Sequence, residues 1–293
     1  MGQKEAQMTL DKLIKSSAPY GLARGLRNLP RFRNEFLLYH GREKLNSELE
    51  SVFVVNVHKA ASTLAPKLIS SLLPALGGRI AVDIVGYLWT YTSFPLPDSV
   101  DCLQSRLYRP RGYIYVPLRR VFWADAIASH PVVAIVRDPR DVLVSFWYSH
   151  AFSHDLPYHP KRVKEFEMLR AQALRSNPAS YWRQQLPFVK QSYESIMAAH
   201  RSNARMIVLR YEDMLDHFDE WISGFAHGLG LGRPDQDQLV LLREVAGIGR
   251  EATGDWGKHV RAKDAGQYLN EWDGATIREV SRALQSVLDY FGY

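Results

Sequence analysis

Residues 58–63, with the sequence HKAAST, combine a basic side chain with two hydroxyls directly after the apolar run 52–57. The run is typical of a buried parallel strand, and a helical apolar pattern follows the loop. A loop of small residues at such a junction exposes backbone N–H groups at the positive end of the helix dipole. The sequence therefore predicts a cradle for a phosphate-like anion, made of Lys59, Ala60, Ala61, Ser62 and Thr63. The alternative is an ordinary turn in which Ser62 caps the helix and Lys59 is exposed.

A second cluster of polar residues begins at Arg137, where another apolar run ends. Asp138 as N-cap, Pro139 at the first helical position and Asp141 at the third are all explained by helix capping. Capping explains neither Arg137, a costly charge at a strand end, nor Ser145, about two turns along the same helix face. Arg137 and Ser145 are therefore predicted to hold a second phosphate. The alternative is that Arg137 pairs with a nearby carboxylate.

Three strand–junction–helix units must position these side chains. Short apolar runs at 52–57, 132–136 and 206–209 each meet a polar junction and then a helical pattern. This alternation predicts an α/β fold in which helices flank a central parallel sheet. The chain has no internal repeat and no long Gly/Ser/Pro-rich linker, so we expect a single domain. Ligands of such sheets bind at the carboxyl ends of the strands, where all three junctions fall.

The composition of the chain indicates its cellular compartment and the charge of its partners. The 293 residues carry 37 basic and 31 acidic side chains, a net charge of +6 that favours an anionic partner without naming one. Cys102 is the only cysteine, which excludes an intramolecular disulfide and a Cys-rich zinc site. We find no apolar stretch of about 20 residues and no signal-peptide centre in residues 1–16. The sequence therefore predicts a cytoplasmic protein without a transmembrane segment.

The first 50 residues are rich in basic side chains among scattered apolar positions. This pattern predicts an N-terminal helical extension, residues 1–50, packed on a core domain of residues 51–293. A solvated basic face is the simpler interpretation of this extension. Peripheral contact with a membrane surface is the alternative.

Four motifs in one order resemble those of the PAPS-dependent sulfotransferase family, which uses 3′-phosphoadenosine 5′-phosphosulfate (PAPS). Residues 55–64 (VNVHKAASTL) are similar to the family's 5′-phosphosulfate loop, and residues 136–145 (VRDPRDVLVS) resemble its 3′-phosphate motif. Residues 209–214 (LRYEDM) and 254–259 (GDWGKH) are similar to two further signatures. The resemblance implies a P-loop-like sulfotransferase fold, PAPS as sulfuryl donor and PAP, the desulfated nucleotide, as product.

Carried over by position, the resemblance gives each motif a role. Lys59, Ser62 and Thr63 would hold the 5′-phosphosulfate, with Lys59 also acting on the leaving group, and Arg137 and Ser145 would hold the 3′-phosphate. Tyr211 would contact the adenosine, and Arg250 would belong to a loop that closes over the 3′-phosphate. Two departures stand out: Leu64 replaces a tryptophan that stacks on adenine, and Glu251 replaces a glycine.

The base that takes the acceptor's proton is the largest gap in the resemblance. The segment nearest to the family's His-Leu-Pro is Tyr115-Val116-Pro117, which has no histidine. A tyrosine is too weakly acidic to be a good base near neutral pH. Other members use a carboxylate after the second core strand, and Asp83 is the nearest equivalent, with a strand-end role as the alternative. His150 and His154 are further candidates.

The acceptor and the rival functions remain open in the sequence. A small molecule or a glycan is the expected acceptor, and aromatic residues within 83–117 and 146–158 could form its pocket or simply pack in the core. No metal site and no nucleic-acid module are predicted, and the oligomeric state is not readable. One rival is a nucleotide-dependent kinase, although both glycines of its phosphate loop are missing. The other is a catalytically silent protein that binds PAP or PAPS on the same fold.

Overall fold

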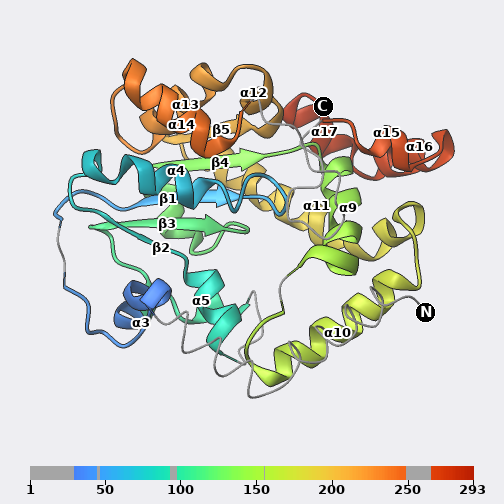
Figure 1. The fold of residues 1–293 in the computed structure, drawn as a ribbon, viewed down its shortest axis with the longest axis horizontal. Coiled ribbons are helices and arrows are strands. Elements are labelled where there is room, and N and C mark those ends of the chain that lie inside the picture. Colours follow the sequence, from blue (N-terminus) through green and yellow to red (C-terminus); the bar gives the residue numbers. More distant parts are fainter. Residues whose placement is uncertain (1–29, 45–46, 93–97, 155, 249–264) are drawn as a thin grey trace, which may run out of the picture.

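A single five-stranded parallel sheet forms the centre of the molecule (Figure 1). The structure is a computed structural model that describes residues 30–44, 47–92, 98–154, 156–248 and 265–293. The strands are β1 (Val52–Asn56), β2 (Ile80–Val82), β3 (Tyr113–Leu118), β4 (Val132–Val136) and β5 (Met206–Arg210), in the spatial order β2-β3-β1-β4-β5. Because all four pairings are parallel, the carboxyl ends of all five strands lie along one edge.

Helices cover this sheet and connect its strands. They are α3 (Arg33–Tyr39), α4 (Ala65–Leu72), α5 (Ile84–Tyr91), α6 (Asp98–Cys102), α7 (Gln104–Leu107), α8 (Ala124–Ser129), α9 (Pro139–Tyr148), α10 (Pro160–Leu174), α11 (Pro178–Ser202), α12 (Tyr211–Asp216), α13 (Phe218–Gly228), α14 (Gln236–Ala246), α15 (Tyr268–Glu271), α16 (Gly274–Ala283) and α17 (Gln285–Phe291). Short 3-10 turns lie at Pro30–Phe32 and Leu73–Ala75, and a π-helical turn, Ser149–Ser153, continues α9. Helix α4 packs on β2 and β3, and α13 packs on β4 and β5.

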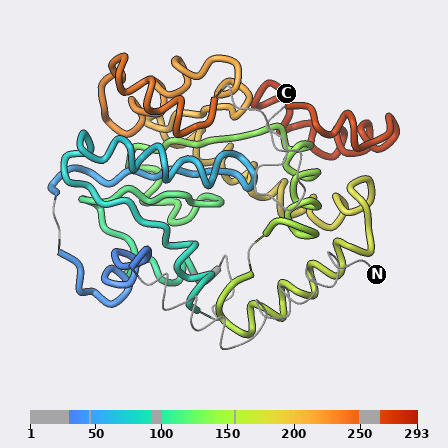
Figure 2. The backbone as a smooth tube through the Cα atoms, in the orientation of Figure 1, coloured from blue at the N-terminus to red at the C-terminus, as the bar shows by residue number. Residues whose placement is uncertain are grey.

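The middle of the sheet is fully buried, as its apolar runs require. Every residue of β1, β3 and β4 is buried, and β1 lies between segments from later in the chain, as the tube in Figure 2 shows. At Gly228 on α13, an added Cβ would come within 2.4 Å of Val133, so the helix lies directly on the sheet. This packing fixes the strand ends that carry the polar junctions.

The predicted fold class is confirmed: a single α/β domain with a central parallel sheet and flanking helices. The three predicted strands are present, and a helix follows each polar junction. The sequence did not predict β3, a central strand that contains Pro117. In the pairing of β1 with β3, Phe53 lies opposite Tyr115 but Val55 lies opposite Leu118, so the register shifts by one residue. This irregularity lets the sheet include Pro117, which has no backbone N–H to donate.

The described part of the N-terminal segment packs on this domain. Helix α3 contacts β2, α5 and α7, and it buries Leu38 together with the neighbouring Phe32. Residues 30–44 are thus in contact with the rest of the domain. The domain boundary at residue 50 and a membrane contact stay predictions, and residues 1–29 lie outside the described part.

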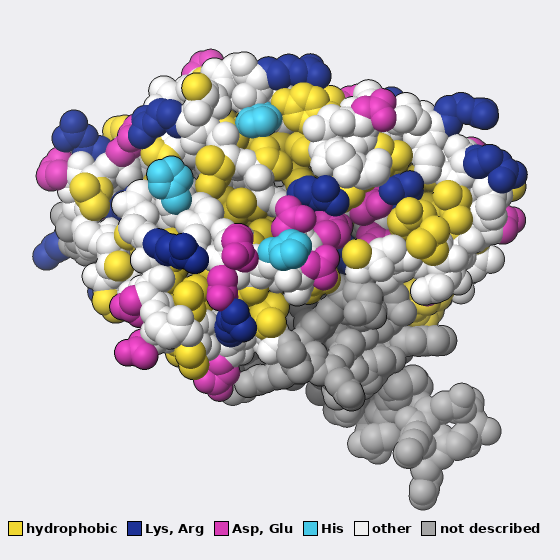
Figure 3. Space-filling model, turned by 90° about the horizontal axis from the view of Figure 1, so that it is seen from above, with side chains coloured by type: hydrophobic (Ala, Val, Ile, Leu, Met, Phe, Trp, Pro, Cys, Tyr) yellow, Lys and Arg dark blue, Asp and Glu magenta, His cyan; other side chains and the backbone are white. Residues whose placement is uncertain are grey.

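Across the described residues, no helix combines the length and the apolar character needed to cross a membrane. On the face drawn in Figure 3, the Lys and Arg side chains are interspersed with Asp and Glu rather than gathered in one patch.

Candidate active site

The loop after β1 has the geometry of an anion cradle. Lys59 (φ 66°) and Ala61 (φ 53°) adopt the left-handed conformation, and the buried Asn56 donates from Nδ2 to the carbonyl of Ala60 at 3.0 Å. The backbone N–H groups of Ala61, Ser62 and Thr63 donate to no group in the described part of the chain. Turns that alternate these conformations form concave sets of free N–H groups that suit an anion.

The start of α4 excludes the simpler interpretation of this loop. Leu64, not Ser62, is the N-cap of α4, and no side chain caps this helix. The hydroxyls of Ser62 and Thr63 therefore remain available before the first helical turn, and Thr63 is exposed. The proposed alternative of a Ser-capped turn is wrong.

Lys59 lies over the junction in a partly buried position. Its Nζ donates to Oγ of Ser149, in the π-helical turn after α9, at 3.0 Å. Burial, with the positive charges of Arg119 and Arg137, lowers the pKa of Lys59 to about 8. An anion bound here would stabilise the charged form of Lys59 and reverse part of this shift.

Arg137 brings the second junction against the first. The guanidinium donates from Nη1 to the carbonyl of Lys59 at 3.3 Å, and it lies 4.8 Å from the ring centre of Tyr211. Nη2 also meets Oδ2 of Asp141 at 3.4 Å. The alternative of a carboxylate partner for Arg137 is thus correct, and this partner does not remove Arg137 from the cradle.

Asp141 has a role that the capping interpretation missed. Asp138 caps α9 by accepting from the backbone N–H of Arg140 at 2.9 Å, with Pro139 in the first turn, as predicted. Asp141 is instead fully buried, and it accepts from the backbone N–H groups of Gly266 at 2.9 Å and Tyr268 at 3.1 Å. It therefore ties the C-terminal segment to the Arg137 junction.

The third junction closes the cradle from the β5 side. Tyr211 opens α12 with its ring against Arg137, and Glu212 accepts from the backbone N–H of Asp138 at 2.9 Å. Glu212 also accepts from the Tyr293 hydroxyl at 3.0 Å. Ser145 lies partly buried on α9, one helical turn beyond Asp141. The ends of β1, β4 and β5 thus form one continuous surface, which we call the donor half of the site.

The ends of β2 and β3 form a second surface, the acceptor half, beside the donor half. Asp83 follows β2 and caps α5, since its Oδ1 accepts from the backbone N–H of Gly86 at 2.7 Å. Burial raises the pKa of Asp83, while the charge of Arg119 acts in the opposite direction. Arg119 directly follows β3, and its charge also acts on Lys59. Arg119 therefore lies within electrostatic reach of both halves.

Comparison with known proteins agrees with this arrangement of junctions. The sulfotransferase domain family matches residues 128–243, a stretch that contains Arg137, Ser145 and Tyr211. Among solved structures, the chain is similar to the mouse sulfotransferase SULT7A1 complexed with PAP, with a TM-score of 0.54, 13% identity, and coverage of 87% of this chain and 89% of that one. The chain therefore has the sulfotransferase fold, and its residues 128–243 match the sulfotransferase domain family.

A second solved structure matches less closely. Retinol dehydratase in complex with androsterone and inactive cofactor PAP gives a TM-score of 0.49, with 16% identity over 87% of this chain and 85% of the other. No curated protein sequence matches the chain. At such low identity the structural likeness establishes the sulfotransferase fold alone.

Within this sulfotransferase fold, Tyr115 is a core residue. Its hydroxyl donates to the carbonyl of Leu107 at 3.0 Å and accepts from the backbone N–H of Arg109 at 2.7 Å. Those partners precede β3, so the hydroxyl points to the amino ends of the strands, away from Lys59. Burial also raises the pKa of Tyr115. Tyr115 is therefore wrong as a candidate base.

Two histidines, His58 and His150, lie near Lys59, and a third, His154, lies beside His150. The sequence did not single out His58. The ring of His58 lies between Phe146 and Phe188, with centres 5.3 and 5.0 Å away. His150 accepts or donates at Nδ1 with the Tyr181 hydroxyl at 2.8 Å, and burial lowers its pKa to about 3. His154 lies 6.4 Å from His150, ring centre to ring centre. His58 and His150 are thus neutral near pH 7, and both pack among aromatic rings.

Several residues of the site carried no motif that could have revealed them. Arg119 and Ser149 belong to no recognised pattern, and His58 could be suspected only from its place beside Lys59. Arg250 and the segment 254–259 lie outside the described residues, as does Phe94. Trp147 and Tyr148 are used structurally, since Trp147 donates to the carbonyl of Ala173 at 2.9 Å and Tyr148 to Glu271 at 2.5 Å.

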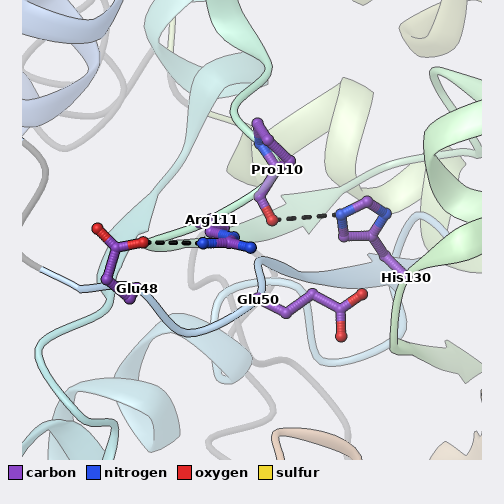
Figure 4. Close-up of a pocket in the computed structure, with 5 residues that line it drawn as sticks. All are labelled: Glu48, Glu50, Pro110, Arg111 and His130. Carbon is purple, nitrogen blue, oxygen red and sulfur yellow. Dashed lines mark hydrogen bonds and ion pairs between the residues drawn. The ribbon is translucent and has the colours of Figure 1, made fainter.

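A pocket of about 380 Å³ lies at the opposite edge of the sheet (Figure 4). Its lining residues precede the strands: Glu48, Glu50, Pro110, Arg111 and His130. Arg111 pairs with Glu48 at 3.0 Å, and Nε2 of His130 lies 3.3 Å from the carbonyl of Pro110. Glu50 pairs with Arg205, outside the pocket, at 2.5 Å. The pocket lies away from the carboxyl ends of the strands and does not belong to the candidate active site.

Proposed function

We propose that this chain transfers a sulfuryl group from PAPS to a hydroxyl or amine of an acceptor. The observation that carries the proposal is the contact between the two predicted phosphate junctions. Arg137 donates to the backbone carbonyl of Lys59, and its positive charge acts on the Lys59 ammonium. Both lie beside backbone N–H groups that donate to no group in the described part of the chain. A nucleotide with phosphates at both ends of its ribose matches this distribution of positive charge.

The described residues fit the phosphosulfate end of such a nucleotide. Ala61, Ser62 and Thr63 offer backbone N–H groups, and the two hydroxyls add donors. Lys59 holds a proton within the cradle and can neutralise charge that develops on the bridging oxygen. The nucleotide, when bound, supplies an activated sulfuryl group whose sulfur–oxygen bond breaks as the acceptor oxygen or nitrogen bonds to sulfur.

The 3′-phosphate end would contact Arg137 and Ser145. Tyr211 and Asp141 orient the guanidinium of Arg137 before any ligand binds, which lowers the entropy cost of binding. Tyr211 is also placed to pack against the adenosine. Arg250 stays a proposed contributor that lies outside the described residues.

Asp83 is the proposed acceptor base in the described part of the chain. Its carboxylate lies at the end of β2, and its raised pKa makes it a stronger base than an exposed aspartate. It would take the proton released when the acceptor attacks sulfur. The charge of Arg119 would hold Asp83 ionised between turnovers and would assist Lys59 in the transition state.

The acceptor is proposed to be a small molecule or a glycan that lies against the aromatic cluster around Tyr91, whose ring is partly exposed at the end of α5. Ring centres of Tyr91 lie 5.5 Å from Tyr87, 5.7 Å from Phe32 and 6.1 Å from Tyr158. Aromatic faces of this kind pack against apolar rings and sugar rings alike. The predicted cytoplasmic location accompanies this proposal and rests on the single cysteine.

Calorimetry with nucleotides tests the donor half directly. PAP should bind at least about tenfold more tightly than AMP, which lacks the 3′-phosphate, and more tightly than ATP with magnesium. Transfer of radiolabelled sulfate from PAPS is then measured with 2-naphthol, a sterol and an amino sugar as acceptors. Equal affinity for PAP and AMP would refute the 3′-phosphate site. PAP binding without transfer to any acceptor would favour the catalytically silent alternative.

A further inference from the structure

Glu35, in the N-terminal helix α3, is buried although its side chain is ionisable. It retains 4% of its exposure and lies on the face of α3 that packs against β2 and α5. Oε2 of Glu35 is buried without a hydrogen-bond partner in the described part of the chain. An unsatisfied buried carboxyl oxygen destabilises the fold, so this residue calls for a reason other than stability.

A hydrogen bond of the Glu35 carboxyl group leads into the acceptor half. Oε1 of Glu35 accepts a hydrogen bond of 2.6 Å from the backbone N–H of Asp83. Asp83 in turn caps α5 through Gly86 at 2.7 Å. An added Cβ at Gly86 would lie 2.3 Å from Oδ2 of Asp83, so the glycine leaves room for the carboxylate. The position of Asp83 is therefore set from two sides, by Glu35 and by the first turn of α5.

The charges around Glu35 make its ionisation sensitive to the site. Burial is the main cause that raises its pKa to about 7, and the negative charge of Asp83 acts in the same direction. Arg31 acts in the opposite direction, and Tyr87 on α5 also interacts with the carboxyl group. Glu35 thus changes its charge near neutral pH, beside the backbone of Asp83.

We infer that Glu35 is a positioning residue for Asp83, and that its protonation state controls how the acceptor half presents the Asp83 carboxylate. The inference rests on the proposed function, in which Asp83 accepts the proton. In this proposal, helix α3 of the N-terminal segment takes part in the reaction, although it carries none of the family's motifs.

The kinetic test compares Glu35→Gln, Glu35→Ala and the control Glu43→Gln. Glu43 is a partly buried carboxylate of the same segment that pairs with Arg109 at 2.5 Å. Transfer from PAPS to 2-naphthol, or to the best acceptor of the panel, is measured as kcat against pH. The wild-type protein should show an inflection near pH 7 that Glu35→Gln lacks, while the maximal kcat of Glu35→Gln should stay within about threefold of wild type. Glu35→Ala should lower kcat about 10- to 100-fold with an unchanged KM for PAPS. Glu43→Gln should retain both the inflection near pH 7 and the wild-type kcat.

A double-mutant cycle distinguishes positioning from general damage. Once Asp83→Asn has removed the base, Glu35→Ala should cause little further loss of kcat, because both changes act through one group. Additive losses, a Glu35→Gln variant with the wild-type inflection, or a Glu35→Ala variant with wild-type kcat would each overturn the inference.

Thermal unfolding tests the same carboxyl group without activity. A carboxyl whose pKa is higher in the folded state stabilises the fold when protonated, so this contribution is lost as pH rises from about 4.5 to about 7. The melting temperature of Glu35→Gln should therefore rise relative to wild type between pH 5 and pH 8. No such rise would overturn the inference, whereas loss of PAP binding by the wild-type protein would instead overturn the proposed function.

Discussion

The donor and acceptor halves of the site are held in different ways. In the donor half, the ends of β1, β4 and β5 bind one another: Arg137 contacts the Lys59 loop, and Glu212 contacts Asp138. In the acceptor half, Asp83 is held from outside the sheet, by Glu35 of α3. The donor half is thus a closed network within the core domain, and the acceptor half depends on the N-terminal segment.

This difference matches the two proposed tasks of the site. Binding a doubly phosphorylated nucleotide requires fixed donors, and a network of buried hydrogen bonds provides them before the ligand arrives. Recognising an acceptor requires a surface whose shape can differ from one protein of the same fold to another. Such surfaces are built from peripheral helices and loops. Five predictions test this separation, from the largest expected effect to the smallest.

Lys59→Ala should lower kcat by about 10²- to 10³-fold, because it removes the charge that neutralises the leaving phosphate. The melting temperature should stay within a few degrees of wild type, since Lys59 makes one side-chain hydrogen bond with the described residues, to Ser149. Radiolabelled sulfate transfer and thermal unfolding measure the two effects. A fully active variant would contradict the assigned role.

Asp83→Asn should lower kcat by about 10²-fold while PAP affinity stays unchanged, because a base is lost from the acceptor half alone. Asparagine retains the capping oxygen for Gly86, so α5 should remain stable. Transfer rates and PAP calorimetry on the same variant check this. If PAP affinity fell as strongly as kcat, the separation of the halves would be wrong.

Arg137→Ala should weaken PAP binding by about 10- to 100-fold, the usual value of charge-assisted hydrogen bonds. It should also destabilise the fold, because it leaves the fully buried Asp141 without its cation. Arg137→Lys serves as the matched variant that keeps the charge. Calorimetry with PAP and AMP should show that both variants lose more affinity for PAP than for AMP.

The affinity for PAP should fall above pH 8 by up to about tenfold per pH unit. Lys59 is protonated below its pKa of about 8 and neutral above it, so the free protein loses a charge that the anion needs. Titrations from pH 6 to 9.5 should show a break near 8 that Lys59→Ala removes. A break near pH 7, where Glu35 titrates, would indicate that the halves are coupled.

Gly86→Ala should lower kcat several-fold without changing PAP affinity. The new Cβ would displace the Asp83 carboxylate, since 2.3 Å is far below a normal contact. Replacing glycine by alanine favours the helix, and this gain offsets the loss of the Asp83 cap, so the melting temperature should change little. Wild-type kcat in this variant would show that the present position of Asp83 is not needed.

The donor half could be predicted largely from the sequence. A charged residue at the end of a buried run has few structural explanations, and Lys59 and Arg137 both stood in that position. The parallel pattern of strands then implied that the two junctions share an edge. The exception was Asp141, because a carboxylate at the third helical position fits a cap as well as an anchor.

The acceptor half could not be predicted in this way. β3 was missed because a proline argues against a central strand, and Arg119 at its end was missed with it. Glu35 lies 48 positions before its partner Asp83, in a segment whose composition indicated only a basic surface helix. A contact between distant segments leaves no periodic trace in either of them.

The sequence by itself determined the parallel α/β fold and the two polar junctions that we propose bind phosphate, because hydrophobic period and residue type act locally. Only the tertiary structure decided which carboxylate anchors the C-terminal segment, which arginine lies between the halves, and which helix holds Asp83. These contacts depend on the packing of segments that are far apart in the chain. The free energy of such packing is set by both segments together, so neither segment's sequence predicts it alone.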